Sequence, residues 1–263
     1  GRFEEVYKLA RGTRYFYYVR GQLDRRLLVD KLHLEAARHA ANRKEELRAL
    51  AYHILIAGRQ SGENLVEQYH AELEQCVSTF QVLPDNLAAL YWQASAMYQM
   101  NREKYAESVA LWEKTLEYHD PRMVVGARHW IARCYFLLSQ LDKARQTLEE
   151  SLPIVQREGF TRSILIHHLL LAQIAARQKR TQDAWDLLNA GLAQAEHLTC
   201  PIERAEEMLV RGTLLWQQGE TQKAVEELKG ACDRFERMKM KELAEARELL
   251  ERLEFSDPSL AYR

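Results

Sequence analysis

Hydrophobic positions along the chain recur with the spacing of amphipathic α-helices, and short polar turns separate the helical segments. Four of these turns align without gaps and each ends in alanine: residues 101–106, 139–144, 179–184 and 219–224. The closing residues Ala106, Ala144, Ala184 and Ala224 are 38, 40 and 40 residues apart. Self-similarity at a fixed period of this length predicts a repeat architecture.

Small residues recur at two further places in these segments. Twelve residues before each alanine stand Ala94, Ala132, Ala172 and Gly212. The last three alanines are followed four residues later by Leu148, Leu188 and Leu228, and seven residues later by Ser151, Gly191 and Ala231. Because two helices approach closely only where side chains are small, this pattern predicts antiparallel helical hairpins, and a larger residue there would overpack them.

Helix starts and turns extend the pattern to the whole chain. Pro84, Pro121, Thr161 and Pro201 open four segments at spacings of 37, 40 and 40 residues, and proline suits the first helical turn. Turn positions form a longer series with two earlier members: Gly21, Gly62, Asn101, Ser139, Lys179 and Gly219. Glycine fits such turns because it accepts left-handed backbone angles.

The predicted fold is all-α, with thirteen helices. Six hairpins cover approximately residues 2–41, 44–80, 84–118, 121–158, 161–197 and 201–238, and an amphipathic helix over 241–255 covers the exposed end of the stack. Residues 256–263 form a tail. Pro153 falls inside a predicted helix and should kink it between Glu149 and Pro153.

These small, turn and alanine positions resemble the tetratricopeptide repeat family. The resemblance covers residues 1 to about 240 and is strongest over 84–238. It implies a right-handed α-α superhelix, a solenoid like that of the family. The repeats are about six residues longer than the usual repeat of that family.

Long repeats of this kind resemble the C-terminal sensor repeats of signal-transduction ATPases with numerous domains (STAND-type) and of related transcription activators. The opening segments 18–24, 32–38 and 45–51 carry this second resemblance. It implies an ATPase outside this chain, which has no phosphate-binding Gly-x-x-x-x-Gly-Lys-Ser/Thr motif. Because the chain begins at Gly1 and not at Met, we expect it to be part of a longer protein whose flanking domains are missing.

The family resemblance also implies a binding surface, because its first helices line the concave side of the superhelix. Residues at helical spacing on those helices are the predicted partner-binding groove: Arg11, Tyr15, Tyr18, Tyr52, Tyr91, Ser95, Tyr98, His129, Arg133, Gln173, Arg177 and Trp216. Further candidates at the same spacing are Lys8, Arg48, Arg59, Phe136, Leu169, Leu209, Thr213 and Gln217. The alternative interpretation is that the tyrosines pack between repeats.

Tyrosine and arginine together favour a protein or peptide segment of acidic character as the partner. Tyrosine offers a large contact area, and arginine binds carboxylates through two parallel hydrogen bonds. The Lys/Asn set with which some members of the family clamp a chaperone's terminal carboxylate does not occur here, so that partner is not expected. The sequence therefore predicts a non-catalytic sensor or scaffold module of a larger regulatory protein.

The charge distribution supports a second hypothesis. The net charge is −1, but residues 1–60 carry 13 Lys and Arg against 7 Asp and Glu. A basic N-terminal hairpin could bind nucleic acid, although solvated helix faces explain such charges more simply. A purely architectural element that holds flanking domains is the third hypothesis.

Catalytic and metal-binding patterns are not found in the sequence. The four cysteines have no metal-type or disulfide-framework spacing, which favours reduced thiols in the cytoplasm. The nine histidines include no ligand-type pair at helical spacing. The most apolar stretch, residues 164–176, is too short to span a membrane. We therefore expect no enzyme, no cofactor, no metal and no membrane partner.

Overall fold

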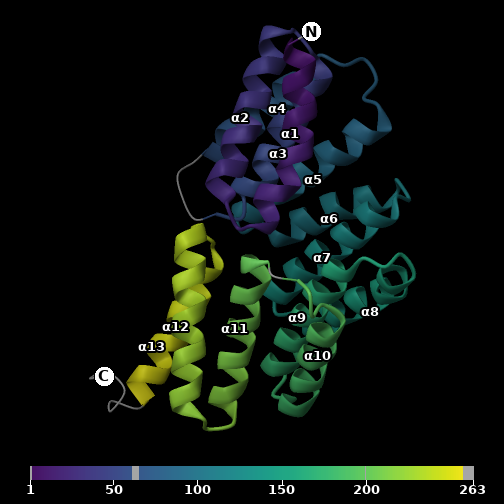
Figure 1. Cartoon of the computed structure of the whole chain (residues 1–263). Helices are drawn as coiled ribbons and strands as arrows, with labels where there is room; N and C mark the ends of the chain where they lie inside the picture. The colour runs from purple at the N-terminus through teal and green to yellow at the C-terminus, as the bar shows by residue number, and fades with distance from the viewer. Residues whose placement is uncertain (1, 61–64, 199, 257–263) are drawn as a thin grey trace. The chain divides into compact units, whose positions relative to one another are not determined.

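The computed structural model describes residues 2–60, 65–198 and 200–256. These residues form thirteen α-helices and contain no strand, as the sequence predicts (Figure 1). The all-α fold is therefore confirmed. The chain divides into two compact units, residues 1–138 and 139–263, and each unit is described by itself.

Unit 1 contains the first seven helices. Their bounds are α1 (Arg2–Val19), α2 (Leu23–His39), α3 (Arg43–Ala57), α4 (Leu65–Val77), α5 (Asp85–Asn101), α6 (Tyr105–Leu116) and α7 (Pro121–Leu137). Each helix packs against the next, and α3 also packs against α5. A hairpin that contacts mainly its neighbour in the chain is the arrangement expected of stacked repeats.

Unit 2 repeats this arrangement with six helices. They are α8 (Leu141–Arg157), α9 (Thr161–Arg177), α10 (Thr181–Gln194), α11 (Pro201–Gln217), α12 (Thr221–Met238) and α13 (Glu242–Ser256). Successive helices pack together, α9 also packs against α11, and α13 lies beside α11 and α12 (Figure 1). Helix α8 continues through Pro153 to Arg157, and the expected kink there stays a prediction.

A left-handed residue closes the first helix of each of five hairpins. These residues are Gly21, Glu103, Ser139, Lys179 and Gly219, with φ of 65°, 61°, 58°, 59° and 79°. The following amides then bond back to the end of the helix, as in Gln22 N to Tyr17 O at 2.9 Å and Glu220 N to Leu215 O at 2.9 Å. This pattern satisfies carbonyls that the helix end leaves unpaired. The predicted turn residue Gly62 lies outside the described residues.

The predicted register of the third hairpin is wrong by two residues. Its left-handed residue is Glu103, because α5 continues through Asn101 before the chain turns. Counting five residues on from the left-handed residue gives Ala144, Ala184 and Ala224 in later hairpins, and here it gives Ser108. Ser108 is fully buried and its hydroxyl donates to the Ala96 carbonyl at 2.8 Å, whereas Ala106 is exposed. The gap-free alignment paired Ala106 with the later alanines because Ala106 also follows a turn, although it is exposed.

The corrected register places buried residues at equivalent points of the hairpins. One stands seven residues before the left-handed residue, and the others stand five, nine and twelve residues after it. In the third hairpin these residues are Ala96, Ser108, Trp112 and Thr115, and in the sixth they are Gly212, Ala224, Leu228 and Ala231. The first hairpin has Arg14, Arg26, Asp30 and His33 there, and all four are buried too. The interior of this first hairpin is therefore charged.

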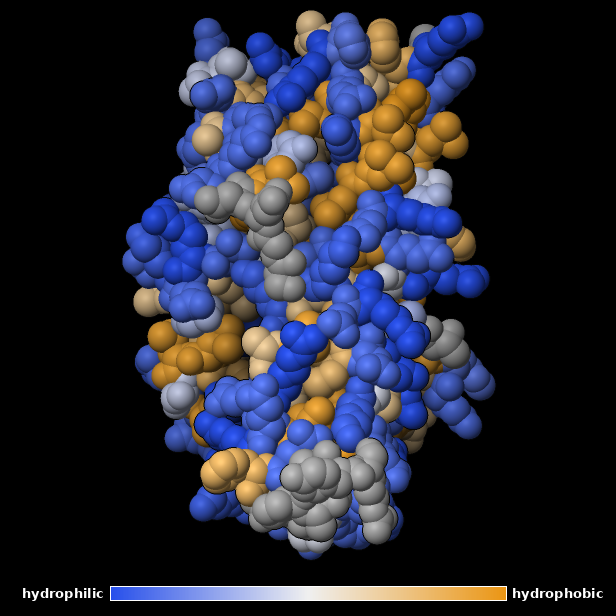
Figure 2. Space-filling view, turned by 90° about the vertical axis from the view of Figure 1, so that its left-hand side faces the viewer, coloured by the Kyte–Doolittle hydropathy of each residue, from blue (hydrophilic) through white to orange (hydrophobic). Residues whose placement is uncertain are grey.

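Polar side chains cover much of the face shown in Figure 2, with apolar side chains between them. Large exposed apolar side chains are concentrated on the first hairpin, where Leu9, Phe16, Leu28 and Leu32 are each at least half exposed. Isolated exposed apolar residues are normal on folded proteins. None of the described helices combines the length and apolar character that crossing a membrane requires.

Candidate functional site

Unit 1 contains a pocket with a volume of about 500 Å³, within the range of small-molecule and side-chain binding sites. Its walls come from the first helices of four successive hairpins, α1, α3, α5 and α7, together with Trp112 of α6. Aliphatic and sulfur-containing side chains such as Leu55, Leu90 and Met97 supply much of the lining. The pocket therefore offers one continuous surface across helices that are distant in sequence.

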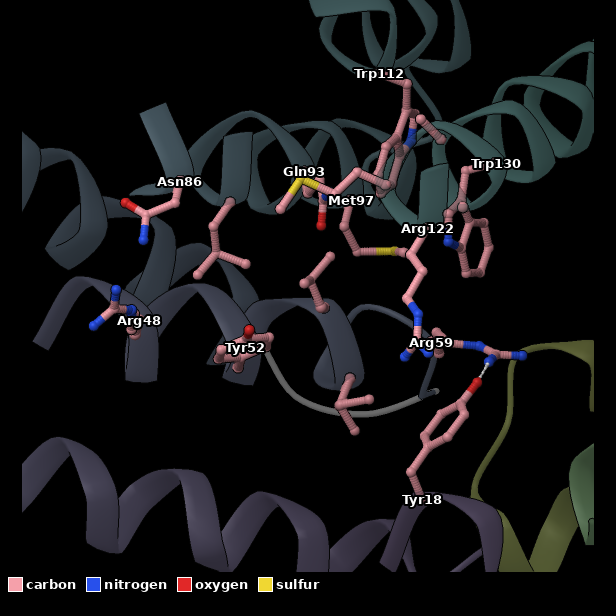
Figure 3. A pocket seen from close by; sticks show the side chains of 16 residues that line it. Tyr18, Arg48, Tyr52, Arg59, Asn86, Gln93, Met97, Trp112, Arg122 and Trp130 are labelled. Carbon is pink, nitrogen blue, oxygen red and sulfur yellow. Dashed lines mark hydrogen bonds between the residues drawn. The ribbon is translucent and has the colours of Figure 1, made fainter. Parts of the chain in front are cut away.

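Three arginines, Arg48, Arg59 and Arg122, provide the charge of the pocket. None of the described residues that line it is Asp or Glu. In Figure 3, Arg48 lies at one end and Arg59 and Arg122 lie at the other, with Tyr52, Gln93 and Met97 in between. An elongated ligand with negative groups beside apolar groups would match this distribution of charge.

Arg59 is held between aromatic rings at its end of the pocket. It donates a hydrogen bond to the Tyr18 hydroxyl (Figure 3), and its guanidinium carbon lies 5.3 Å from the centroid of the Trp130 ring. Trp130 in turn stacks on Trp112 with centroids 6.2 Å apart and planes 13° apart. Cation–π contacts of this kind restrict the orientation of the guanidinium.

A buried ion cluster adjoins the other end of the pocket. It consists of Arg14, Arg26, Asp30, His33 and Glu45. Asp30, which is fully buried, accepts hydrogen bonds from Arg14 Nε at 2.9 Å and from Arg26. Arg14 Nη2 lies 2.9 Å from His33 Nδ1, and His33 Nε2 lies 2.9 Å from Glu45 Oε2.

This geometry determines the state of His33. An arginine only donates hydrogen bonds, so Nδ1 of His33 accepts and Nε2 carries the proton that it donates to Glu45. A second proton would point at the Arg14 guanidinium. Burial, and next the charge of Arg14, lower the pKa of His33. The cluster is therefore built around a neutral imidazole.

Two residues connect the ion cluster to the pocket wall. Arg48, which lines the pocket, donates to Glu45 Oε1 at 2.6 Å. Tyr52, which also lines it, has the Arg14 guanidinium carbon 3.9 Å from its ring centroid. Burial would raise the pKa of Glu45, but hydrogen bonds from Arg48 and His33 outweigh burial and lower it. Glu45 therefore stays ionised and holds Arg48 in place.

Of the predicted groove residues, Tyr18 and Tyr52 line the pocket, as do the further candidates Arg48 and Arg59. Arg11 forms an ion pair with Glu45 on the cluster side. Tyr15 is 62% exposed and Lys8 is exposed on α1. These last three residues are not among those that line the pocket, and a binding role for them stays a prediction.

Tyr91, Ser95 and Tyr98 lie on another face of α5, against α4. Tyr98 stacks on His70 with centroids 3.9 Å apart, Ser95 Oγ lies 3.2 Å from His70 Nε2, and the Tyr91 hydroxyl donates to Glu74 at 2.9 Å. The register error explains this placement, because two residues correspond to a rotation of about 200° around a helix. These three residues form an interface between hairpins.

The remaining predicted residues contact other parts of their own units. His129 packs edge-on against Trp130, and the Arg133 guanidinium lies 5.5 Å from the Phe136 ring centroid. In unit 2, Gln173 is buried, Arg177 pairs with Glu245 at 3.4 Å, and Trp216 is half-buried. Their part in binding also stays a prediction.

The sequence reasoning missed most of the pocket wall contributed by α5 and α7. The missed residues include Asn86, Leu90, Gln93, Met97, Trp112, Arg122 and Trp130. The signal for two of them was present. The spacing that selected His129 and Arg133 around Ala132 selects Gln93 and Met97 around Ala96, once Ser108 replaces Ala106 in the alignment.

Several histidines and cysteines outside the pocket are buried, and burial shifts their pKa. Burial lowers the pKa of His53 and His167 to about 4 and raises that of the Cys76, Cys134 and Cys200 thiols to about 11. Protonated thiols are poor nucleophiles. Within the described residues, no three His, Cys, Asp or Glu side chains are grouped so that they could hold a metal ion.

Comparison with known proteins matches part of the chain to a repeat family. Residues 94–158 match the family model of the tetratricopeptide repeat. The CTR9 homolog protein of Arabidopsis thaliana is 33% identical over 87 residues, which are 32% of this chain and 8% of that protein. The chain thus matches less than a tenth of the length of this curated relative.

Solved structures share the fold over nearly the whole chain. A Rap protein complexed with Competence and Sporulation Factor superposes with a TM-score of 0.73 at 15% identity, covering 98% of this chain and 73% of that one. NprR in complex with its cognate peptide NprX superposes with a TM-score of 0.58 at 13% identity, covering 96% of this chain and 78% of that one. At such identities the likeness concerns the fold.

Proposed function

We propose that this helical-repeat chain, part of which matches the tetratricopeptide repeat, binds a segment of another protein in the pocket of unit 1 and does not act as a catalyst. The observation that carries this proposal is the set of arginines that stand beside aromatic and apolar side chains in the pocket wall. Arg48, Arg59 and Arg122 line it, and the described lining residues include no carboxylate. An acidic segment with apolar side chains would satisfy both parts of the wall.

The comparisons support a peptide as the kind of ligand. NprR, a structural neighbour, is described in complex with a peptide, and the Rap protein with a named factor. In unit 1, the pocket crosses α3, α5 and α7, so an extended chain could contact several helices in turn. Tryptophan and arginine are also the residues that most often dominate binding energy at protein interfaces.

Ion pairing within the first hairpins argues against nucleic acid as the ligand. Outside the pocket, many of the arginines that make residues 1–60 basic are bonded to carboxylates: Arg11 to Glu45, Arg14 and Arg26 to Asp30, and Arg38 and Arg43 to Glu46. Arg48 is also bonded to Glu45, but it lines the pocket. Nucleic acid binding requires Lys and Arg side chains that can neutralise phosphates. The basic excess of this region is therefore largely committed to internal contacts.

Selection from a display library of random short peptides tests the proposal. We expect the full chain to enrich peptides in which Asp or Glu stands beside a large apolar side chain. Arg122→Glu should weaken the selected peptide at least about tenfold, which is about 1.4 kcal/mol. Arg25→Glu is the matched control, because Arg25 is an exposed arginine of α2 that does not line the pocket. Equal binding of the peptide by both variants and the unaltered chain would remove the pocket as the site.

A larger regulatory protein is the proposed setting of this module, with the repeats as its sensor or scaffold part. The support is the likeness of the long repeats and of segments 18–24, 32–38 and 45–51 to those of signal-transduction ATPases. The sequence of the complete gene tests whether the repeats belong to a larger regulatory protein. An ATPase or DNA-binding domain encoded on the same chain is expected, and a gene that encodes neither would refute it. A cytoplasmic location stays a prediction as well.

A further inference from the structure

The ion cluster occupies positions that the other aligned hairpins fill with small or apolar residues. Relative to the left-handed turn residue, Arg14 corresponds to Ala172 and Gly212, and Arg26 corresponds to Ala184 and Ala224. Asp30 and His33 correspond to Leu188 and Gly191 of the fifth hairpin. All of these residues are buried. The repeat therefore closes its hairpin without any charge at these four positions.

Stability does not explain charges at these positions. Transfer of ions from water to a protein interior is unfavourable, and apolar replacements of buried ion clusters are often neutral or stabilising. Asp30 is fully buried, Arg26 is 3% exposed and His33 is fully buried, so none of them keeps its hydration. Closing the first hairpin therefore does not by itself require the cluster.

The contacts of the cluster lead to the pocket. From Asp30 the hydrogen bonds run through Arg14, His33 and Glu45 to Arg48. The Arg14 guanidinium also covers one face of the Tyr52 ring. Arg48 and Tyr52 are thus two pocket residues that the cluster contacts. Without these partners, Arg48 would keep its flexible side chain and Tyr52 would lose the cation on its ring.

We propose that the buried ion cluster of Arg14, Arg26, Asp30, His33 and Glu45 positions Arg48 and Tyr52 for the acidic segment, and so sets the affinity of the pocket. This inference rests on the proposed function. Orienting a guanidinium before binding removes the entropy loss that binding would otherwise incur. Arg48 and Tyr52 touch the ligand, and the cluster residues act through them.

An apolar replacement of the cluster separates positioning from stability. The variant Arg14→Met/Arg26→Met/Asp30→Leu keeps similar volumes and leaves neither a buried arginine nor Asp30. We expect its thermal midpoint to be equal to or above that of the unaltered chain. Its affinity for the library-selected acidic peptide should fall about tenfold, because Tyr52 loses the Arg14 guanidinium and the His33 that bonds Glu45 loses its Arg14 partner. Unchanged affinity in a variant that melts normally would overturn the proposal.

Arg38→Met is the matched control for this variant. Arg38 also stands on α2 and also forms ion pairs, with Glu46 and Glu72, but neither it nor these partners line the pocket. Peptide affinity should therefore stay within about twofold of the unaltered chain, a change under about 0.5 kcal/mol. A loss equal to that of the triple variant would mean that any ion pair of this hairpin has the same effect, which would overturn the specific role of the cluster.

An NMR measurement on the chain without peptide tests the positioning of Arg48 directly. It applies even if the triple variant does not fold or the selection yields no peptide. In the unaltered chain, the Arg48 guanidinium protons should give resolved NMR signals, assigned by their loss in Arg48→Lys. Glu45→Gln should merge these signals with those of solvent-exposed arginines. Signals that are identical in Glu45→Gln would overturn positioning by the cluster. Failure of the peptide selection alone would overturn only the proposed function.

Discussion

The first hairpin, α1 and α2, and the last hairpin, α11 and α12, turn the chain in the same way but fill their interiors differently. Both turns use a left-handed glycine, Gly21 and Gly219. Between the helices, the last hairpin has Gly212 packed against Leu228, and a Cβ added at Gly212 would lie 2.7 Å from Leu228 Cγ. The first hairpin has Arg14 and Arg26 around Asp30.

The same backbone repeat can therefore be stabilised by complementary shape in one hairpin and by complementary charge in another. The last hairpin requires small volume, because its helices approach too closely for an added side chain. The first hairpin requires complete pairing, because each buried charge depends on its partner. Different substitutions should therefore lower the free energy of unfolding of the two hairpins.

The largest effect is expected from removal of the shared carboxylate in the first hairpin. Asp30→Ala leaves Arg14 and Arg26 buried without their common partner. Loss of one member of a buried ion group lowers the free energy of unfolding by about 3–5 kcal/mol. Urea unfolding followed by circular dichroism measures the change. A loss below about 1 kcal/mol would show that water or other groups replace the carboxylate easily.

Acid should weaken unit 1 more than unit 2. Burial lowers the pKa of His33, His53 and His70 in unit 1, and of His167 in unit 2. A folded-state pKa below the unfolded value near 6.5 means that this stability is present above pH 6.5 and is lost as the pH falls toward the folded value. For His53, with a pKa of about 4, the loss at pH 5 is about 2 kcal/mol.

Hydrogen exchange measured separately on the amides of each unit at pH 7 and pH 5 tests this expectation. His53→Leu should reduce the pH dependence of unit 1, because neither ring nitrogen of His53 has a hydrogen-bond partner in the described part of the chain. His167→Leu is the counterpart in unit 2. Equal acid sensitivity of the two units would contradict the prediction.

A single added methyl group should destabilise the last hairpin and stabilise the first. Gly212→Ala places its Cβ against Leu228, so the free energy of unfolding should fall by about 1 kcal/mol. Gly12→Ala in α1 is the matched control, because nothing lies within 4 Å of its Cβ position. This substitution should stabilise the protein by about 0.5–1 kcal/mol through helix propensity. Thermal and urea unfolding of both variants give the signs, and equal signs would refute the distinction.

The smallest effect is expected at the position that the sequence alignment chose wrongly. Ala106→Leu lies on the exposed side of α6 and should change the free energy of unfolding by less than about 0.5 kcal/mol. Ala224→Leu, at the true small-residue position of the sixth hairpin, should lower it by about 1–3 kcal/mol. A large loss at Ala106 would restore the original register.

The sequence by itself determined the helices, their turns and the repeat. Each of these features depends on neighbours within a few residues, such as the left-handed turns at Ser139 and Lys179 or Pro121 in the first turn of its helix. The placement of a binding surface on the first helices was implied by the family resemblance, and it stays a prediction; Tyr18 and Tyr52 are the two predicted groove residues that line the pocket. The sequence did not determine the register of the third hairpin, because Ala106 and Ser108 are both small.

Only the tertiary structure decided which residues share the pocket and which charges meet inside unit 1. Glu45 receives hydrogen bonds from Arg11 and His33, which precede it by 34 and 12 residues. Helical periodicity states which face a residue occupies but not what lies opposite, since the partner is set by how separate helices pack. A buried Arg14 and an exposed Arg2 of the same helix therefore read alike in sequence, and packing alone makes one of them part of an ion cluster.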